Sequence, residues 1–311
     1  MNELNSEFQV IGIDIGGSHI TAGLVDLKRR ALVNDYLRRE FVDCHASSEE
    51  ILQNWTDTIK AVIDKFQLTK PRLGFAMPGP FDYSRGICFI KGFDKYESLY
   101  GMNIRKELAF RLSVSEENIL FRNDAEAFLE GECFLGAGQY FDEVIGITLG
   151  TGLGSSIRKG GYTRDAQLSI ILYNGEIIEE AVSTRGLLRN YYRETRQQLK
   201  DVKEVAGIHA NDPAAKKAFC QFGEDLSWFL TMFIQQEKPE ALVIGGNIVQ
   251  AWELFMEQVI RNLKISLVET GIVIELPVIV KATLGESAAL VGGACFHESY
   301  RGQNAALSKG N

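Results

Sequence analysis

Two glycine-rich turns hold the residues best suited to chemistry in this sequence. The first is Asp14-Ile15-Gly16-Gly17-Ser18 and the second is Gly150-Thr151-Gly152-Leu153-Gly154. Glycine lets the backbone approach a bound group closely, and successive N–H groups of a turn can face an anion. A carboxylate such as Asp14 can also hold a hydrated magnesium ion beside phosphates. Both turns are therefore candidate phosphate-binding sites, although Asp-x-Gly-Gly alone also makes a good structural turn.

A repeated pattern leads into these turns. The run Val10-Ile11-Gly12-Ile13 recurs as Val144-Ile145-Gly146-Ile147, and each run enters its glycine turn directly. A second strand-like segment follows each turn, at 20–25 and at 154–158. The pattern predicts a β-hairpin at the head of each half of the chain. Two related domains explain this best, with chance similarity as the alternative.

The remaining segments alternate between helical and strand-like patterns. Apolar residues recur at helical spacing in some, and short β-branched runs mark others. Helices are expected at 49–66, 104–112, 125–134, 183–199, 213–236 and 248–263, and strands at 72–77, 119–121, 241–244 and 278–282. Such alternation predicts an α/β fold.

Asn123 and Asp124 stand where a strand is expected to end and a helix to begin. One interpretation is a helix N-cap, because Asn and Asp accept hydrogen bonds from free N–H groups there. The other is functional, because open α/β sheets bind ligands at the carboxyl ends of their strands. A helix N-terminus keeps Asp124 ionised, which suits a base that accepts a proton from a hydroxyl. The two interpretations are compatible.

Four other segments stand out. Pro78-Gly79-Pro80 must turn the chain after a strand, and 91–103 is either a substrate lid or a plain surface loop. Gly245-Gly246-Asn247 follows a buried strand and leaves room for a flat adenine ring. The small residues of 285–294 allow another backbone to come close, for which tight helix packing is the simpler explanation.

Length, composition and charge exclude several classes of protein. The 311 residues suffice for about two domains, and 45% hydrophobic with 24% charged residues is typical of a soluble globular chain. A net charge of −8 disfavours nucleic-acid binding. No apolar run reaches the roughly 20 residues that span a bilayer, and the first eight residues lack the basic start of a secretory signal. Five cysteines without a C-x-x-C pair predict reduced thiols and a cytoplasmic location.

The order and spacing of these motifs resemble the ROK family (repressor, open reading frame, kinase) over roughly residues 8 to 298. That family belongs to the actin, heat-shock 70 and sugar kinase superfamily. The resemblance implies two ribonuclease-H-like α/β domains with an interdomain cleft that holds ATP. We expect these domains at 1–122 and 123–311, with a last helix near 286–300 that can pack back on the first.

The resemblance also implies an activity and its residues. We expect a glucokinase-like enzyme that uses ATP and Mg²⁺ to phosphorylate a hydroxyl of a hexose or hexose derivative. Asp124 would be the catalytic base, and Asp14 would hold magnesium through water. The sugar-binding residues would be Gly79, Asn123, Asp124 and Glu180, and the nucleotide-binding residues Asp14, Gly16, Gly17, Ser18, Thr151, Gly152, Gly245, Gly246 and Asn247.

One region departs from the family pattern. Many members carry a Glu-x-Gly-His segment and a cysteine-rich zinc loop after the second phosphate turn, but 154–180 holds no histidine and no cysteine. Zinc is therefore not expected. Glu180 matches the last sugar-binding glutamate, while Glu176 and Glu179 leave the register open. The sequence does not identify the sugar.

Three alternatives follow from this departure and from the family's other branch. In these alternatives the chain would be a kinase for an amino sugar or another polyol, a catalytically silent nucleotide- or sugar-binding protein, or a transcription repressor. A repressor needs an N-terminal helix-turn-helix, and only about eight residues precede the first expected strand. Small molecules are the expected partners, without nucleic acid or membrane, and the family's frequent dimers leave a homodimer open.

Overall fold

The computed structural model describes residues 8–92, 94–269 and 275–307. The prediction that a secretory signal is absent concerned the first eight residues, of which all but the last lie outside the described residues. The chain divides into two compact units, which we call unit 1 (Met1–Gln139 with Glu286–Asn311) and unit 2 (Tyr140–Gly285). The boundary expected between residues 122 and 123 falls inside unit 1. The reason is that helix α3 (Asp124–Leu135) packs along the last helix, α8 (Ser287–Leu307).

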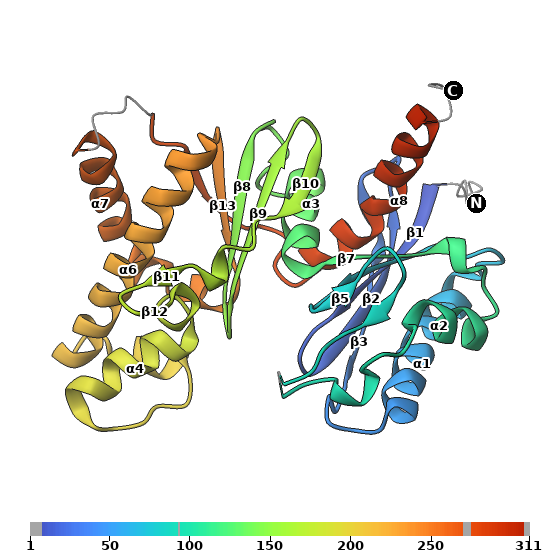
Figure 1. Cartoon of the computed structure of the whole chain (residues 1–311), viewed down its shortest axis with the longest axis horizontal. Helices are drawn as coiled ribbons and strands as arrows, with labels where there is room; N and C mark the ends of the chain where they lie inside the picture. Colours follow the sequence, from blue (N-terminus) through green and yellow to red (C-terminus); the bar gives the residue numbers. More distant parts are fainter. Residues whose placement is uncertain (1–7, 93, 270–274, 308–311) are drawn as a thin grey trace. The chain divides into compact units, whose positions relative to one another are not determined.

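Unit 1 is built on a five-stranded mixed sheet (Figure 1). Its strands in spatial order are β3 (Ala31–Phe41), β2 (His19–Asp26), β1 (Gln9–Ile15), β4 (Leu73–Met77) and β7 (Ile119–Asn123). The first three are antiparallel, and β1, β4 and β7 are parallel, so their carboxyl ends lie at one edge of the sheet. A two-stranded hairpin, β5 (Phe81–Asp82) with β6 (Ile87–Cys88), follows β4.

One face of this sheet is covered by α1 (Ser48–Phe66) and α2 (Ile104–Leu112). The Ser47 hydroxyl accepts from the Glu50 N–H and the Glu50 carboxylate accepts from the Ser47 N–H, so a capping box fixes the start of α1. The helix then buries Trp55 and neighbouring apolar residues against Ile11 and Ile13 of β1. The predicted helical period at 49–66 is confirmed.

The opposite face of the sheet meets α8 through glycines. A Cβ on Gly12 of β1 would lie 2.2 Å from the Leu290 carbonyl oxygen, and one on Gly74 of β4 would lie 2.1 Å from the Gly293 carbonyl oxygen. Real Cβ atoms do not come this close, so the backbones of strand and helix touch directly. The tight packing predicted for the small residues of 285–294 is confirmed.

Unit 2 repeats the same strand order. Its sheet runs β10 (Tyr162–Asp165), β9 (Leu153–Lys159), β8 (Val144–Leu149), β13 (Ala241–Gly245) and β14 (Val278–Lys281). Here too the first three strands are antiparallel, and β8, β13 and β14 are parallel. Both predicted hairpins and the α/β class are confirmed, and the shared order supports two related halves.

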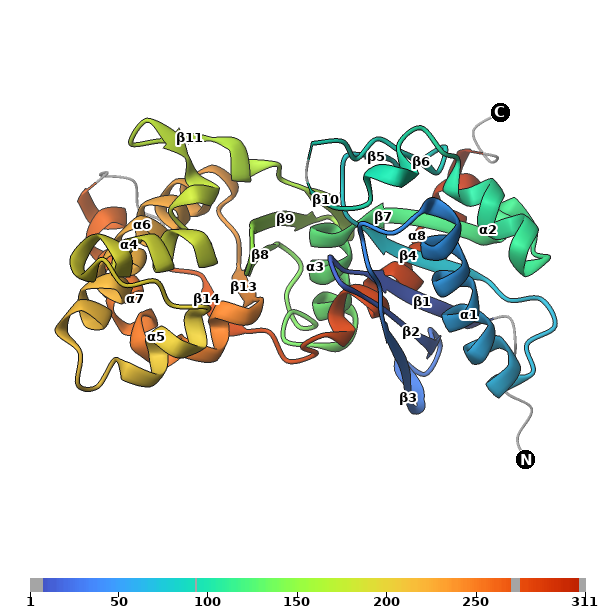
Figure 2. The ribbon, with the colours of Figure 1, turned by 90° about the horizontal axis from the view of Figure 1, so that it is seen from below.

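The helices of unit 2 gather on one side of β13 (Figure 2). They are α4 (Thr184–Thr195), α5 (Val202–Ile208), α6 (Pro213–Glu237) and α7 (Met256–Glu269). Helix α6 begins at an Asp212 N-cap followed by Pro213 at its first position, a combination typical of helix starts. It buries four phenylalanines completely in one apolar cluster with β8 and β13. A small hairpin, β11 (Leu172–Tyr173) with β12 (Glu176–Ile177), precedes α4.

Two predicted helices differ from the structure. The helix expected at 248–263 is instead a 3₁₀ segment, Asn247–Leu254, followed by α7, because the backbone kinks at Ala251 and Phe255. The helix expected at 183–199 ends at Thr195, since Arg196 adopts a left-handed conformation. Among the described helices, none has the length and apolar character needed to span a bilayer.

Candidate active site

The first glycine turn joins β1 to β2 in unit 1. The Gly16 N–H donates to the His19 carbonyl oxygen at 2.9 Å, which closes the turn, and the Ser18 hydroxyl lies 2.8 Å from His19 Nδ1. A Cβ on Gly17 would meet nothing within 4 Å, so steric contact inside the unit does not explain glycine there. The tip of this turn, at Gly17 and Ser18, is therefore open and exposed.

Asp14, at the end of β1, lies in an unusual electrostatic environment. Its pKa is raised to about 7, mainly by burial and in addition by the negative charge of Asp124, while the Arg39 guanidinium acts in the opposite direction. Arg39 is itself paired with Glu286 at the start of the segment that returns to unit 1. The structure therefore brings Asp14 and Asp124 close enough to repel each other, although they are far apart in the sequence.

Tyr96 makes a hydrogen bond to the first turn that the sequence did not predict. Its hydroxyl donates to the Gly16 carbonyl oxygen at 2.6 Å, and its ring packs edge-on against Trp55. Burial raises the pKa of this hydroxyl, so it stays a donor. Tyr96 belongs to the 91–103 segment, which the sequence left as either a lid or a surface loop. This segment is anchored by a fully buried tyrosine under the turn.

Asn123 and Asp124 lie where β7 passes into α3. The Asn123 carboxamide oxygen accepts from the N–H groups of Ala125 and Glu126, at 2.8 and 3.3 Å, so the predicted N-cap is confirmed. The carboxylate of Asp124 accepts from the Ala125 N–H at 2.9 Å and is solvent-exposed. An exposed carboxylate at a helix N-terminus is accessible to a substrate hydroxyl.

Tyr83 links two of the predicted sugar-binding positions. Its hydroxyl donates to the Met77 carbonyl oxygen at 3.1 Å and accepts from the Asn123 amide at 3.3 Å. A Cβ on Gly79 would lie 3.3 Å from the same hydroxyl. Gly79 and Asn123 therefore gather around Tyr83, because Met77 and Asn123 are paired across the parallel strands β4 and β7. No motif in the sequence marked Tyr83.

The second glycine turn joins β8 to β9 in unit 2, and an acidic side chain fills its interior. Glu179 accepts from the Leu153 N–H at 2.9 Å, and a Cβ on Gly152 would lie 2.5 Å from the same carboxylate oxygen. A side chain at 152 would therefore displace the Glu179 carboxylate from this position. Of the three glutamates that left the register open, Glu179 is the one that contacts this turn.

Arg185 connects the second turn to Glu180. Its guanidinium donates to the Thr151 carbonyl oxygen at 2.9 Å and pairs with Glu180 at 2.7 Å and Glu179 at 3.2 Å. The Arg185 hydrogen bond lowers the pKa of Glu180, which stays ionised. The Glu180 carbonyl oxygen accepts from Arg189 at 3.1 Å. Arg185 is a further residue that sequence reasoning missed.

Gly245 and Gly246 end β13 beside the second turn. Gly245 is paired with Thr148 of β8, and Gly246 has a φ of 92°, which disfavours any other residue. A Cβ on Gly246 would also lie 2.3 Å from the Leu149 carbonyl oxygen. The exposed Asn247 follows at the start of the 3₁₀ segment. Unit 2 thus places Gly245, Gly246 and Asn247 next to the strand that leads into Thr151.

Among the residues that the structure describes, no group of three or more His, Cys, Asp and Glu side chains is arranged to hold a metal ion. The expectation that zinc is absent stays a prediction. The paired carboxylates Asp14 and Asp124 are a different case, because a hydrated magnesium ion needs one or two carboxylates and takes its other oxygens from water and substrate.

Comparison with known proteins gives a consistent result. The ROK family model matches residues 10–165 and 173–299. A glucokinase from Thermotoga maritima is 27% identical over 93% of this chain and 96% of that protein. An N-acetyl-D-glucosamine kinase from Mannheimia succiniciproducens is 24% identical over 92% of this chain and 98% of its own length.

A solved structure agrees with the fold. The ROK family glucokinase from Streptomyces griseus, in complex with glucose and AMPPNP, matches with a TM-score of 0.75 at 23% identity, over 93% of this chain and 98% of that one. The predicted fold class, two sheet-containing α/β domains of the actin, heat-shock 70 and sugar kinase superfamily, is confirmed.

Proposed function

This chain belongs to the ROK family, and from that membership we propose that it is an ATP-dependent kinase that phosphorylates a hydroxyl of a hexose or hexose derivative. One observation carries the proposal furthest. The carboxyl ends of β1 and β7 place Asp14 and the exposed Asp124 within electrostatic range of each other, and Asn123 beside them directs its amide at Tyr83. A base, a candidate magnesium carboxylate and a hydrogen-bonding amide thus share one edge of the unit 1 sheet.

Asp124 acts as the base in the proposed reaction. Its carboxylate accepts the proton of the sugar hydroxyl as the hydroxyl oxygen bonds to the γ-phosphorus, while the bond from that phosphorus to the ADP oxygen breaks. The α3 N-terminus stabilises the ionised carboxylate before transfer. Phosphoryl transfer depends mainly on position and charge neutralisation, so Asp124 contributes chiefly by orienting the attacking oxygen.

Magnesium fits the acidic pair of unit 1. The charge of Asp124 raises the pKa of Asp14, a divalent cation would relieve that repulsion, and Asp14 lies directly beside the open glycine turn. When bound, Mg²⁺ neutralises phosphate charge. Asp14 would hold it through water.

The nucleotide and sugar contacts are assigned unit by unit. In unit 1 we assign the nucleotide's phosphates to the first turn, and in unit 2 we assign phosphate and adenosine contacts to the second turn and to the end of β13. The assigned residues are Asp14, Gly16, Gly17 and Ser18 in unit 1, and Thr151, Gly152, Gly245, Gly246 and Asn247 in unit 2. The sugar is assigned to Gly79, Asn123, Asp124 and Glu180.

An amino sugar is a second candidate acceptor. The similarity to an N-acetyl-D-glucosamine kinase favours it, at 24% identity over nearly the whole chain. The segment 154–180, which includes the short β11–β12 hairpin, holds no histidine and no cysteine, so substrate contacts on this side must differ from those of zinc-containing members. Small-molecule partners, a cytoplasmic location and a homodimer remain predictions.

The test follows ADP release from magnesium and ATP with hexoses and amino sugars added singly. We expect one sugar class to stimulate release, and Asp124→Asn to lower that rate by about 10²- to 10⁴-fold while ATP binding is nearly unchanged. The matched control is Asp57→Asn, which neutralises an exposed carboxylate on α1 of the same unit.

The outcomes separate the alternatives. An Asp124→Asn protein that keeps most of its activity would remove Asp124 from the mechanism. ATP binding without turnover on any sugar would favour the catalytically silent alternative. Stimulation by N-acetylglucosamine alone would select the amino-sugar acceptor.

A further inference from the structure

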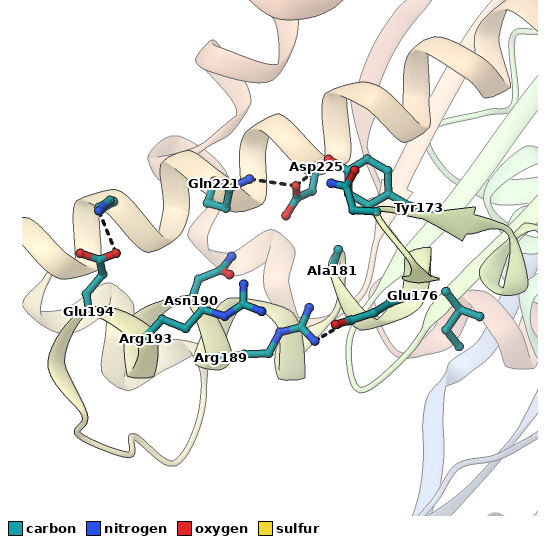
Figure 3. Close-up of a pocket in the computed structure, with 12 residues that line it drawn as sticks. Tyr173, Glu176, Ala181, Arg189, Asn190, Arg193, Glu194, Gln221 and Asp225 are labelled. Carbon is teal, nitrogen blue, oxygen red and sulfur yellow. Dashed lines mark hydrogen bonds and ion pairs between the residues drawn. The ribbon is translucent and has the colours of Figure 1, made fainter.

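A polar cavity lies inside unit 2, separate from the two glycine turns. It has a volume of about 410 Å³ and is bounded by α4, α6 and the β11–β12 hairpin (Figure 3). Pockets that take small molecules commonly measure about 300–1,000 Å³, so one compact metabolite fits. The proposed function assigns no role to this cavity.

The polar residues that line the cavity recur at helical spacing on both α4 and α6. Arg189 and Arg193 stand one turn apart on α4, with Asn190 beside them. On α6, Lys217, Gln221 and Asp225 repeat every four residues along one face. Facing helices normally interdigitate apolar side chains, so two polar stripes across a cavity are unusual for a purely structural contact.

Most acidic groups in the cavity already have partners. Glu176 pairs with Arg189 at 2.5 Å, and Glu194 pairs with Lys217 at 2.8 Å. Asp225 accepts from the Tyr173 hydroxyl at 2.8 Å and from the Gln221 amide at 3.0 Å. Each of these three carboxylates therefore has at least one donor from the walls of the cavity, and each keeps further lone pairs.

The donors on α4 are not all used. Asn190 is only 8% exposed, yet its amide nitrogen has no acceptor among the described residues, and neither has the buried Nε of Arg189. Arg193 has no ion pair with any described residue, although it lines the same space. Figure 3 shows Arg189, Asn190 and Arg193 extending together from α4 toward the cavity. Buried donors without acceptors are rare in native proteins, so an acceptor-rich ligand is the simplest explanation.

We propose that this cavity is a second small-molecule site, which binds an anion that carries a phosphate or carboxylate group on a hydroxylated body. The anionic group accepts hydrogen bonds from Arg193 and the Asn190 amide, because charge-assisted bonds from arginine to such groups are strong and geometrically specific. Hydroxyl groups of the body donate to the remaining lone pairs of Asp225 and Glu176. This inference is independent of the proposed kinase activity.

The experiment uses the full chain with 5-fluorotryptophan, without nucleotide. The ring of Trp228 lies 4.5 Å from that of Tyr173, centroid to centroid, and Tyr173 lines the cavity, so the ¹⁹F resonance of Trp228 reports on it. Trp55, in the core of unit 1, is the internal reference. The probes are glucose 6-phosphate, gluconate, inorganic phosphate and uncharged glucose, which separate phosphate, carboxylate and sugar as the recognised group.

We expect glucose 6-phosphate or gluconate to shift the Trp228 resonance saturably, and Arg193→Gln to weaken that affinity about tenfold or more. Arg193 is exposed, so its replacement leaves the fold intact. The matched control is Arg196→Gln, which removes the same charge from the end of α4 outside the cavity lining and leaves the affinity unchanged.

Four results would overturn the proposal. The first three are no shift with any anion, an equal affinity for glucose and for the anions, and equal affinities in the Arg193→Gln and Arg196→Gln proteins. The fourth is a shift confined to Trp55, which would assign the binding to unit 1. Loss of kinase activity has no bearing on these readouts, so the two proposals fail separately.

Discussion

Units 1 and 2 share one strand order but cover their sheets in different ways. In unit 1, α8 packs on β1 and β4 through glycines, so that backbone meets backbone. In unit 2, α6 fills the space above β8 and β13 with four buried phenylalanines. The same topology therefore allows a helix to lie closer to its sheet or farther from it. The size of the side chains at the interface decides which distance a unit adopts.

The two units also differ in charge at the equivalent strand end. Asp14 stands before the first glycine turn, where the repeated pattern places Thr148 before the second. Unit 1 therefore concentrates the acidic groups, while unit 2 supplies a neutral turn buttressed by Glu179 and Arg185. We infer that the two halves keep a common scaffold and have divided the chemical roles between them.

Removing an aromatic side chain from unit 2 gives the largest expected effect on stability. Phe222→Ala deletes a fully buried ring that packs edge-on against Phe255, and we expect a loss of about 3–5 kcal/mol in the unfolding free energy of unit 2. Hydrogen exchange with mass spectrometry assigns the loss to peptides of each unit. Phe110→Ala, at an 85% exposed position, is the control. Equal loss of protection in both units would mean that they unfold as one body.

Adding a single carbon to unit 1 comes next. A Cβ on Gly292 would lie 1.8 Å from the Ala127 carbonyl oxygen, so Gly292→Ala must push α8 away from α3. We expect unit 1 to lose about 1–3 kcal/mol or more, measured by urea unfolding followed through the ¹⁹F resonance of Trp55 in protein labelled with 5-fluorotryptophan. Surface substitutions usually change stability by less than about 0.5 kcal/mol, and a loss as small as this would show that the helix can shift freely.

The charge difference predicts a smaller, pH-dependent effect. The pKa of Asp14 is about 7 when folded against 3.8 for the free group, so the folded state binds more protons between these values. The stability of unit 1 should therefore fall as pH rises from about 4 to about 7 and change little above that. Solvent screening of the partly exposed carboxylate reduces the fall to about 1–2 kcal/mol.

Asp14→Thr tests this slope by giving unit 1 the residue of unit 2. Urea midpoints of unit 1 at pH 5, 6, 7 and 8 should decline in the parent protein and lose that component in the variant. An identical slope in both proteins would mean that Asp14 titrates normally. Magnesium with ATP should also flatten the slope of the parent protein, because a cation favours the ionised carboxylate.

The smallest effect has the opposite sign. Gly207 lies exposed in α5 of unit 2, and a Cβ there would meet nothing within 4 Å. Gly207→Ala should stabilise unit 2 by about 0.5–1 kcal/mol, because alanine favours helix more than glycine does. Its thermal midpoint should rise, whereas that of Gly292→Ala falls. A fall in both would contradict the distinction between packed and unpacked glycines.

Much of the fold was predictable because its signals are local. The hairpins around Asp14 and Thr151 follow from β-branched runs and glycines, and the period of α1 follows from its buried face. Strand β3 was missed because charged and exposed residues interrupt its apolar pattern. The kink at Ala251 was missed because it depends on backbone angles that no residue type there demands.

The candidate site was predictable only where a motif carried it. Asn123 and Asp124 were found through their place between strand and helix. Tyr96 and Arg185 act on the turns from 80 and 34 residues away, through a hydroxyl and a guanidinium that have no fixed partner in sequence. Such contacts depend on the tertiary fold, so local patterns in one sequence do not predict them.

The position of α8 has a consequence for how the protein is made. Strands β1 and β4 leave the ribosome early, but Leu290 and Gly293, which cover Gly12 and Gly74, are translated only after all of unit 2. Unit 2 is continuous in the chain and can fold as soon as it emerges. The half of the molecule that is synthesised first is therefore the half that is completed last, and during translation one face of its sheet awaits a helix that does not yet exist.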